Sequence, residues 1–321
     1  MTLPFDLPLF LRTFRQLDPW WMAASIILVL LTFLGRAVRW QVMMAPVAPQ
    51  APLGRLFVNT AIGFTAGVLL GRAAEIVRPY LIAKAEGVTL SSQLAVWFLE
   101  RMTDLVMVLL IFGLALTQID SSSASQVGPQ MKWVLESSGR LIGLLGGGTC
   151  LVLFAMRHYS GASGARLEAL LARLPARWAP KAAQLIDSFG MGVAATRDTR
   201  AFALILAYTL VEWILVGACY HCIFKSFPPS AHLSWQDSMA VLGFVTFGSI
   251  VQIPGIGGGI QVVTVVVLTQ MFGLGLEHST TLGVVLWLVG MVVIVPLGTV
   301  LAIREGLSFA SLRKIRRATE T

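Results

Sequence analysis

The chain has 321 residues, of which 56% are hydrophobic and 12% charged, and its net charge is +8. Soluble domains carry about 25% charged residues, so this composition excludes a soluble domain and indicates a membrane protein with several spans. In such a protein a basic excess reports orientation and contact with anionic lipid. No nucleic-acid-binding signature accompanies the charge, so we expect no nucleic acid among the partners.

Five apolar stretches are long enough to cross a bilayer as helices. They cover residues 20–35, 92–116, 139–156, 201–224 and 280–302, where a spanning helix needs about 20 residues. Residues 56–91 and 238–275 are each apolar, interrupted, and apolar again. We therefore predict an all-α polytopic membrane protein with about 7–8 hydrophobic segments, forming a single transmembrane domain over residues 1–321.

Glycine and proline break the two interrupted regions, at 71–79 and at 254–259. Gly/Pro-broken segments in corresponding halves point to the binding site of a transporter. If 56–91 crosses the membrane once, the N-terminus is cytoplasmic and about eight spans result. If 56–91 is a re-entrant hairpin, the N-terminus lies outside and 238–275 enters from the opposite side. We favour two hairpins, because a crossing would place Arg36, Arg39 and Arg55 outside.

Basic residues are concentrated in two polar segments, 157–200 and 303–321. The positive-inside rule places both in the cytoplasm, so we expect a cytoplasmic C-terminus. Leucines interleaved with arginines in 157–200 are typical of an amphipathic helix on the cytoplasmic leaflet. A basic connector without that role explains the segment equally well.

The first broken region carries charge where hydrocarbon is expected. Arg72, Glu75 and Arg78 follow directly after the apolar run that ends at Leu70. A charge at bilayer depth costs about 2.5–3.5 kcal/mol on insertion scales, so such groups persist when they are paired, hydrated or functional. We interpret this stretch as a broken helix that holds charge for a polar ligand group.

Three more charges lie inside the stretch 92–116. Glu100 and Asp104 are four residues apart and share a helix face. Arg101 lies one residue round the helix, where it can pair with a carboxylate of a neighbouring helix. These residues form either a polar lining with counter-ions for the other arginines or a buried ion network that fixes helix order. Glu212, in the middle of 201–224, is a further candidate for a coupling or counter-charge site, or a partner of an arginine such as Arg101.

Two other features of the sequence have competing interpretations. Pro254, Gly255, Gly257 and Gly258 permit close approach of the backbone to a ligand, and Gln261 could donate to its oxygens. A tight crossing of small residues is the alternative. The Arg36-x-x-Arg39-Trp40 motif ends the first span, and we interpret it as an interfacial anchor rather than a headgroup contact.

These motifs together resemble the flippase-like membrane domain of the lysylphosphatidylglycerol synthases and their stand-alone relatives. The resemblance rests on Arg36-x-x-Arg39-Trp40, Gly71-Arg72-x-x-Glu75-x-x-Arg78, Glu100-Arg101-x-x-Asp104 and Pro254-Gly255-Ile256-Gly257, in the family's order. It implies a multi-pass protein of the bacterial inner membrane that moves a lipid between leaflets. The family pattern has an acidic residue after the Pro-Gly turn, where this chain has Gln261. Synthase activity is not implied, since the aminoacyl-transferase domain is not part of these 321 residues.

We therefore predict a lipid flippase or transporter for a phospholipid, glycolipid, polyprenyl or hopanoid type of lipid. Arg72 and Arg78 would hold an anionic headgroup, and the acidic residues would balance their charge. No P-loop is present, so ATP is not the energy source. We expect no enzymatic activity and no cofactor. We also expect no metal, because Cys219 and Cys222 alone cannot supply the four ligands of a zinc site.

Two other functions stay open. The chain could be an intramembrane enzyme acting on a lipid headgroup, with Glu100 and Asp104 as acid and base. It could also be a non-transporting scaffold of a lipid-synthesis complex. The partners that we expect are a membrane lipid, further copies of the chain, or lipid-biosynthesis enzymes.

Overall fold

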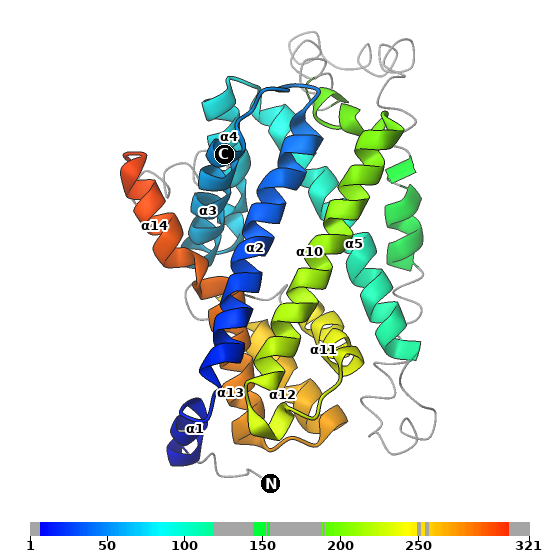
Figure 1. Cartoon of the computed structure of the whole chain (residues 1–321). Coiled ribbons are helices and arrows are strands. Elements are labelled where there is room, and N and C mark those ends of the chain that lie inside the picture. The colour runs from blue at the N-terminus through cyan, green and yellow to red at the C-terminus, as the bar shows by residue number, and fades with distance from the viewer. Residues whose placement is uncertain are drawn as a thin grey trace.

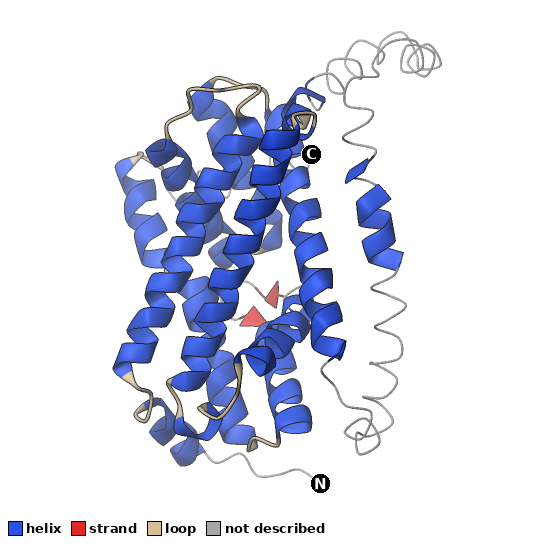
Figure 2. Cartoon of the chain, turned by 45° about the vertical axis from the view of Figure 1, so that its right-hand side comes forward, coloured by secondary structure: helices blue, strands red, loops and turns tan. Residues whose placement is uncertain are grey.

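A computed structural model of the chain describes residues 7–117, 144–151, 153–154, 188, 190–248, 252–253 and 257–307. The described residues form an elongated bundle of helices (Figure 1). A two-residue antiparallel strand pair lies at mid-height inside the bundle (Figure 2). The predicted all-α class is therefore confirmed.

The first half consists of a long helix, a pair of shorter helices and a second long helix. Its elements are α1 (Leu7–Phe14), α2 (Pro19–Met44), α3 (Leu53–Leu70), the 3-10 turn η1 (Arg72–Ile76), α4 (Val77–Glu86) and α5 (Leu90–Thr117). The carboxylate of Asp18 caps α2 by accepting from the backbone N–H groups of Trp20 and Trp21 at 2.8 and 3.1 Å. Gly71 ends α3 with φ 86°, a conformation that favours glycine.

The second half repeats this order. Its elements are η2 (Ala194–Thr196), α10 (Thr199–Lys225), η3 (Pro228–Ser230), α11 (Trp235–Gly248), β1 (Gln252–Ile253), β2 (Gly257–Gly258), α12 (Gly259–Phe272), α13 (Leu276–Trp287), the π-helical η4 (Leu288–Val292) and α14 (Ile294–Arg304). In the strand pair, Gln252 lies opposite Gly258 and Ile253 opposite Gly257. Residues 144–151 form a further helical piece beside α5.

Both interrupted regions are re-entrant hairpins. Arg55 near the start of α3 pairs with Glu86 at the end of α4, with 3.2 Å between Nη1 and Oε1. The chain therefore enters and leaves at one end of the bundle. Helix α4 has 10 residues, or about 15 Å, which is too short for a bilayer core of about 30 Å. Helices α11 and α12, joined by the strand pair, form the second hairpin.

The two hairpins enter from opposite ends. The backbone N–H of Asp18 donates to the carbonyl of Ser226 at 2.7 Å, so the start of α2 lies beside the end of α10. The two long helices are therefore antiparallel (Figure 1). Since the first hairpin follows α2 and the second follows α10, the halves have inverted topology. This is the hairpin alternative of the sequence analysis, and the hairpins explain how charges and glycines reach the middle of the bundle.

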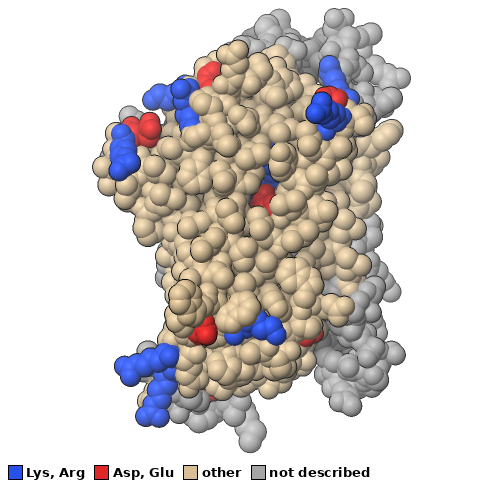
Figure 3. Space-filling view, viewed as in Figure 1, with Lys and Arg blue, Asp and Glu red and all other residues tan. Residues whose placement is uncertain are grey.

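Four helical stretches of the described chain are long and apolar enough to cross a membrane: Pro19–Met44, Leu53–Leu70, Thr199–Lys225 and Leu276–Arg304. Large exposed apolar side chains, such as Ile27, Leu210 and Val300, lie on them. Charged side chains gather at the two ends of the molecule, with an apolar band between them (Figure 3). The protein is a multi-pass membrane protein.

Close packing holds α14 against the first hairpin. A Cβ at Gly298 would collide with the side chain of Thr65, and the Thr65 hydroxyl donates to the carbonyl of Ile294 at 3.3 Å. Between α13 and α14, the π-helical turn η4 interrupts the helix, and such turns recur at functional sites. Most of the predicted connector 157–200 and of the predicted tail 303–321 lies outside the described residues.

Candidate functional site

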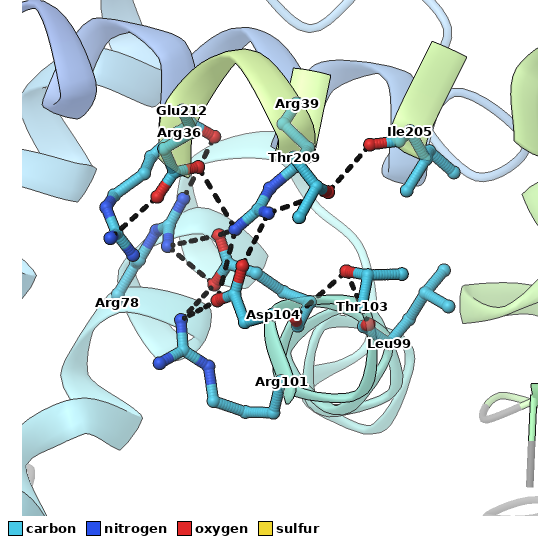
Figure 4. A network of polar contacts seen from close by, with 11 residues as sticks. Arg36, Arg39, Arg78, Leu99, Arg101, Thr103, Asp104, Ile205, Thr209 and Glu212 are labelled. Carbon is cyan, nitrogen blue, oxygen red and sulfur yellow. Dashed lines mark hydrogen bonds and ion pairs between the residues drawn. The ribbon is translucent and has the colours of Figure 1, made fainter. Parts of the chain in front are cut away.

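A buried ion network lies at the centre of the bundle, around Arg39 of α2. Its Nη1 lies 2.6 Å from Oδ1 of Asp104, and its Nη2 lies 3.0 Å from Oε1 of Glu100 and 3.3 Å from Oε2 of Glu212. Nη1 also donates to the hydroxyl of Thr209 at 2.9 Å. The Arg39 side chain is 0% exposed. One cation thus joins carboxylates from α5 and α10 (Figure 4).

The first hairpin supplies a second arginine to this network. Nη1 of Arg78 lies 2.9 Å from Oε2 of Glu100, and Nη2 donates to the backbone carbonyl of Arg36 at 3.2 Å. The guanidinium also lies 4.0 Å from the ring centroid of Trp40, a cation–π contact. Trp40 is fixed in turn, because its Nε1 donates to Gln93 at 2.9 Å. Arg78 is therefore held by an ion pair, a carbonyl and an aromatic face.

Two further arginines lie at the more open edge of the network. Nη2 of Arg101 lies 3.0 Å from Glu100 and 3.1 Å from Asp104, and its side chain is 34% exposed. Arg36 pairs with Glu212 at 2.6 Å and lies over the ring of Phe64 at 4.9 Å. These two guanidinium groups can meet a ligand without the whole network opening.

A cavity of about 390 Å³ adjoins the network. Among the described residues, six charged ones line it, three basic and three acidic: Arg36, Glu75, Arg78, Glu100, Arg101 and Asp104. Arg36 lies eight residues before the end of α2, which places this charge about 12 Å inside the helix end. The charged wall therefore lies within the depth of a bilayer.

The rest of the cavity wall is largely apolar and aromatic. Val29 and Phe33 of α2, Val216 of α10, and Leu242 and Val245 of α11 contribute to it. In the surface view, a small spot of basic and acidic atoms is visible between α2 and α10, surrounded by the apolar band (Figure 3). A polar site and an apolar wall thus lie together where lipid would surround the protein.

The second hairpin reaches the cavity through Ile260, at the start of α12. Next to it, Gly258 adopts φ 128°, and its N–H donates to Oε1 of Gln261 at 2.7 Å. Gly290 and Met291 of η4 line the cavity as well. The structure therefore brings the second broken helix and the π-helical turn to the cavity that the charged residues line.

The structure brings five of the predicted site residues together. Glu75, Arg78, Glu100, Arg101 and Asp104 line one cavity. The side chain of Arg72, and Pro254 and Gly255, lie outside the described residues. Gly257 pairs with Ile253 in the strand pair. Gln261 accepts a hydrogen bond from the backbone N–H of Gly258 in the turn.

Three sequence-based expectations need correction. Arg39 and Trp40 are each 0% exposed and are not interfacial anchors, since α2 continues to Met44 and three carboxylates neutralise Arg39. Arg101 pairs with carboxylates of its own helix rather than of a neighbour. Glu212 is paired with arginines, which confirms one of its two alternatives, but the arginines are Arg36 and Arg39 of α2 and not Arg101.

Sequence reasoning also missed Arg36 and Arg39 as members of the site. Their spacing of three residues places both on one face of α2. Five to eight further residues of the same helix follow them. That overrun of the helix was the signal that could have placed both arginines inside the bilayer.

These observations define a class: a polytopic α-helical membrane protein with two inverted re-entrant hairpins and a charged cavity between them. The chain belongs to the family described as lysylphosphatidylglycerol synthase TM region, whose family model matches residues 2–304. The resemblance drawn from the sequence is therefore confirmed, and it relates the chain to membrane proteins of lipid handling. No curated protein and no solved structure gave a significant match.

Proposed function

We propose that the protein moves a polar-headed lipid between the two leaflets of the membrane. The observation that carries the proposal is the cavity, which joins three arginines and three carboxylates to an apolar wall within the bilayer. An amphipathic ligand needs both surfaces at once. The headgroup would lie against the charged wall, and the chains would stay against Val216, Val245 and the surrounding bilayer.

The size of the cavity supports this division of the lipid. At about 390 Å³ it lies at the small end of ligand pockets, which span about 300–1,000 Å³. Such a volume suits a headgroup and the start of the acyl or isoprenoid chains, and it leaves the rest of the chains in the bilayer. The visible charged spot between α2 and α10 (Figure 3) is the place where we propose that the headgroup enters from the bilayer.

The charged wall has the chemistry to hold a phosphate. Arg36 and Arg101 present guanidinium groups at the edge of the network, and guanidinium suits two-point contact with phosphate oxygens. Glu75 lines the cavity too and could accept from hydroxyl or ammonium groups of the head. We propose that these three residues contact the lipid directly.

Transport explains the network better than catalysis does. Glu100 and Asp104, the candidate acid and base, are each paired with two or three arginines. A carboxylate held this way is a poor proton acceptor, because its charged form is stabilised. The inverted hairpins are also typical of secondary transporters, in which one half moves against the other around a central site. We therefore propose a transporter that is not an enzyme.

The proposed location is a bacterial inner membrane, with the end of α14 on the cytoplasmic side. One end of the bundle carries Arg55, Lys84, Arg197, Arg200 and Arg304, and the last three belong to the basic stretches 157–200 and 303–321 of the sequence. The positive-inside rule supports this orientation. A membrane lipid is the proposed partner, and further copies of the chain or lipid-biosynthesis enzymes are secondary proposals.

Reconstitution of the purified protein into vesicles tests the proposal. Fluorescent lipids with different headgroups are quenched from outside, and the quenched fraction reports exchange between leaflets. We expect the wild-type protein to raise the quenched fraction beyond that of protein-free vesicles, and Arg101→Gln to reduce the effect at least tenfold. Arg304→Gln, an exposed arginine at the end of α14, is the control. Failure of wild-type protein with every headgroup tested would refute lipid movement.

A further inference from the structure

Glu212 is separated from the cavity by the residue that neutralises it. Glu212 is 2% exposed and is not among the described residues that line the cavity. Its shortest ion pair, at 2.6 Å, is with Arg36, which does line the cavity. Any anion that binds Arg36 from the cavity therefore competes with Glu212 for the same guanidinium.

The other charged groups around Glu212 cannot replace Arg36. From α2, Arg39 lies 3.3 Å away, but it is shared with Glu100 and Asp104 of α5. Because both of those carboxylates pair with the same guanidinium as Glu212 does, they are close enough to repel its charge. If Arg36 turns to a ligand, Glu212 is left with Arg39 alone, which it shares with two other carboxylates. Arg78 and Arg101 are engaged by Glu100 and Asp104.

The described network is close to electrically neutral. Four arginines face Glu100, Asp104 and Glu212, and Glu75 lies near Arg101 in the same cavity. An anionic headgroup would therefore add one uncompensated negative charge within the bilayer. Such a charge is strongly unfavourable unless a cation or a proton accompanies it.

We propose that Glu212 takes up one proton when a lipid phosphate binds Arg36, so that a lipid of net charge −1 crosses the membrane together with one proton. This inference rests on the proposed lipid transport and adds its coupling. The balance is simple: the phosphodiester brings one negative charge, and the Glu212 carboxylate becomes a neutral carboxylic acid. The charge of the network is the same before and after binding. On release of the lipid, Arg36 returns to Glu212 and the proton leaves.

The mechanism predicts how the distribution of the lipid between leaflets responds to a pH difference and to a membrane potential. One proton per lipid means that a pH difference of one unit displaces the distribution of the lipid between leaflets about tenfold at steady state. Because the lipid and the proton together carry no net charge, a membrane potential has no effect on that distribution. A zwitterionic lipid needs no proton, and its distribution does not respond to either gradient.

Vesicles of phosphatidylcholine with a trace of fluorescent phosphatidylglycerol test these expectations. We expect the labelled phosphatidylglycerol to accumulate in the inner leaflet when the interior is made alkaline, and fluorescent phosphatidylcholine to stay evenly distributed. Movement of phosphatidylglycerol that ignores the pH difference would overturn the coupling and leave lipid transport standing. A response of the lipid distribution to an imposed potential at constant pH would overturn the electroneutral co-transport of lipid and proton.

Proton uptake on binding is a second measurement that does not depend on transport. Short-chain phosphatidylglycerol is added to wild-type protein in weakly buffered detergent with a pH-sensitive dye. We expect uptake of about one proton per protein, because a single carboxylate changes state. Absence of proton uptake would overturn the proposal even if vesicles show lipid movement. Proton uptake without any lipid movement in vesicles would support protonation of Glu212 on lipid binding and would count against the transport function.

Three variants identify the carboxylate. Glu212→Gln should abolish the proton uptake and the dependence of leaflet distribution on pH. The double variant Arg36→Gln with Glu212→Gln removes one charge of each sign and also the arginine that binds the phosphate, so it should show neither lipid binding nor proton uptake. Glu305→Gln, at an exposed position after α14, should behave as wild type. Full proton uptake in either Glu212 variant would assign the proton to another residue and overturn the proposal.

Discussion

Gly63 of α3 packs directly against the backbone of Arg78 in α4. A Cβ placed on Gly63 would lie 2.5 Å from the Cβ and 2.9 Å from the Cα of Arg78. The absent side chain therefore lets the two arms of the first hairpin approach closely. That approach brings the Arg78 guanidinium to Glu100, so a single glycine controls the geometry of the ion network.

Gly63→Ala should separate the arms of the hairpin and weaken the pairing of Arg78. We expect a loss of stability of about 1–3 kcal/mol, the usual cost of overpacking. Thermal unfolding followed by tryptophan fluorescence in detergent measures it. Gly67→Ala, in the same helix with no atom of the described residues within 4 Å of an added Cβ, is the matched control and should be neutral or stabilising. Equal stability of the two variants would contradict the close approach.

Arg39→Gln should be among the most destabilising single changes in the protein. It leaves Glu100, Asp104 and Glu212 without their shared cation, and loss of one member of a buried ion pair costs about 3–5 kcal/mol. Arg55→Gln removes an arginine whose side chain is 52% exposed and pairs with Glu86, so it should cost less than about 1 kcal/mol. The same unfolding measurement compares the two variants, and similar losses would argue against a central role for Arg39.

The hairpins predict which residues are accessible from each side of the membrane. Cysteines introduced at Gly54 and Lys84 should react with an impermeant maleimide from one side, because both lie at the same end of the bundle. Cysteines at Gln236 and Gly275 should react only from the other side. The experiment uses a chain in which Cys150, the exposed native cysteine, is replaced by serine. Labelling of Gly54→Cys and Lys84→Cys from opposite sides would contradict the first hairpin.

Filling the cavity should stop transport without disturbing the ion network. Gly67 lines the cavity, and no atom of the described residues lies within 4 Å of an added Cβ. We expect Gly67→Leu to reduce lipid exchange in vesicles at least tenfold, because the side chain would occupy the space of the headgroup. The unfolding temperature of Gly67→Leu should stay within a few degrees of that of Gly67→Ala, since a side chain added in the open space of the cavity wall displaces no packed neighbour. Undiminished exchange would show that the lipid takes another path.

Trp40 of α2 contacts the first hairpin through Arg78 and α5 through Gln93, and substitution can separate the two contacts. Trp40→Phe keeps a ring beneath Arg78 but removes the donor to Gln93 at 2.9 Å. The loss should be about 1–3 kcal/mol, because a buried acceptor is left unpaired. Combining it with Gln93→Leu should recover part of that loss. A double variant whose loss equals the sum of the two single losses would contradict the hydrogen bond.

Composition and motifs were enough to establish the class of protein, the family and the two breaks in the helices. Apolar length and the sparse charge establish a membrane protein, because a bilayer admits little else over so many residues. The glycine and proline residues at 71–79 and 254–259 indicated the two hairpins, since these residue types interrupt helices whatever their surroundings.

Which charged side chains pair with one another could not be inferred from the sequence. Arg39 looked like an interfacial residue near the end of a span, yet it is the centre of the network, because carboxylates from α5 and α10 surround it. Hydropathy reports the depth of a residue and not its neighbours. The pairing of Arg36 with Glu212 joins residues 176 positions apart. Such a contact depends on how two antiparallel helices pack, and packing is a property of the folded bundle.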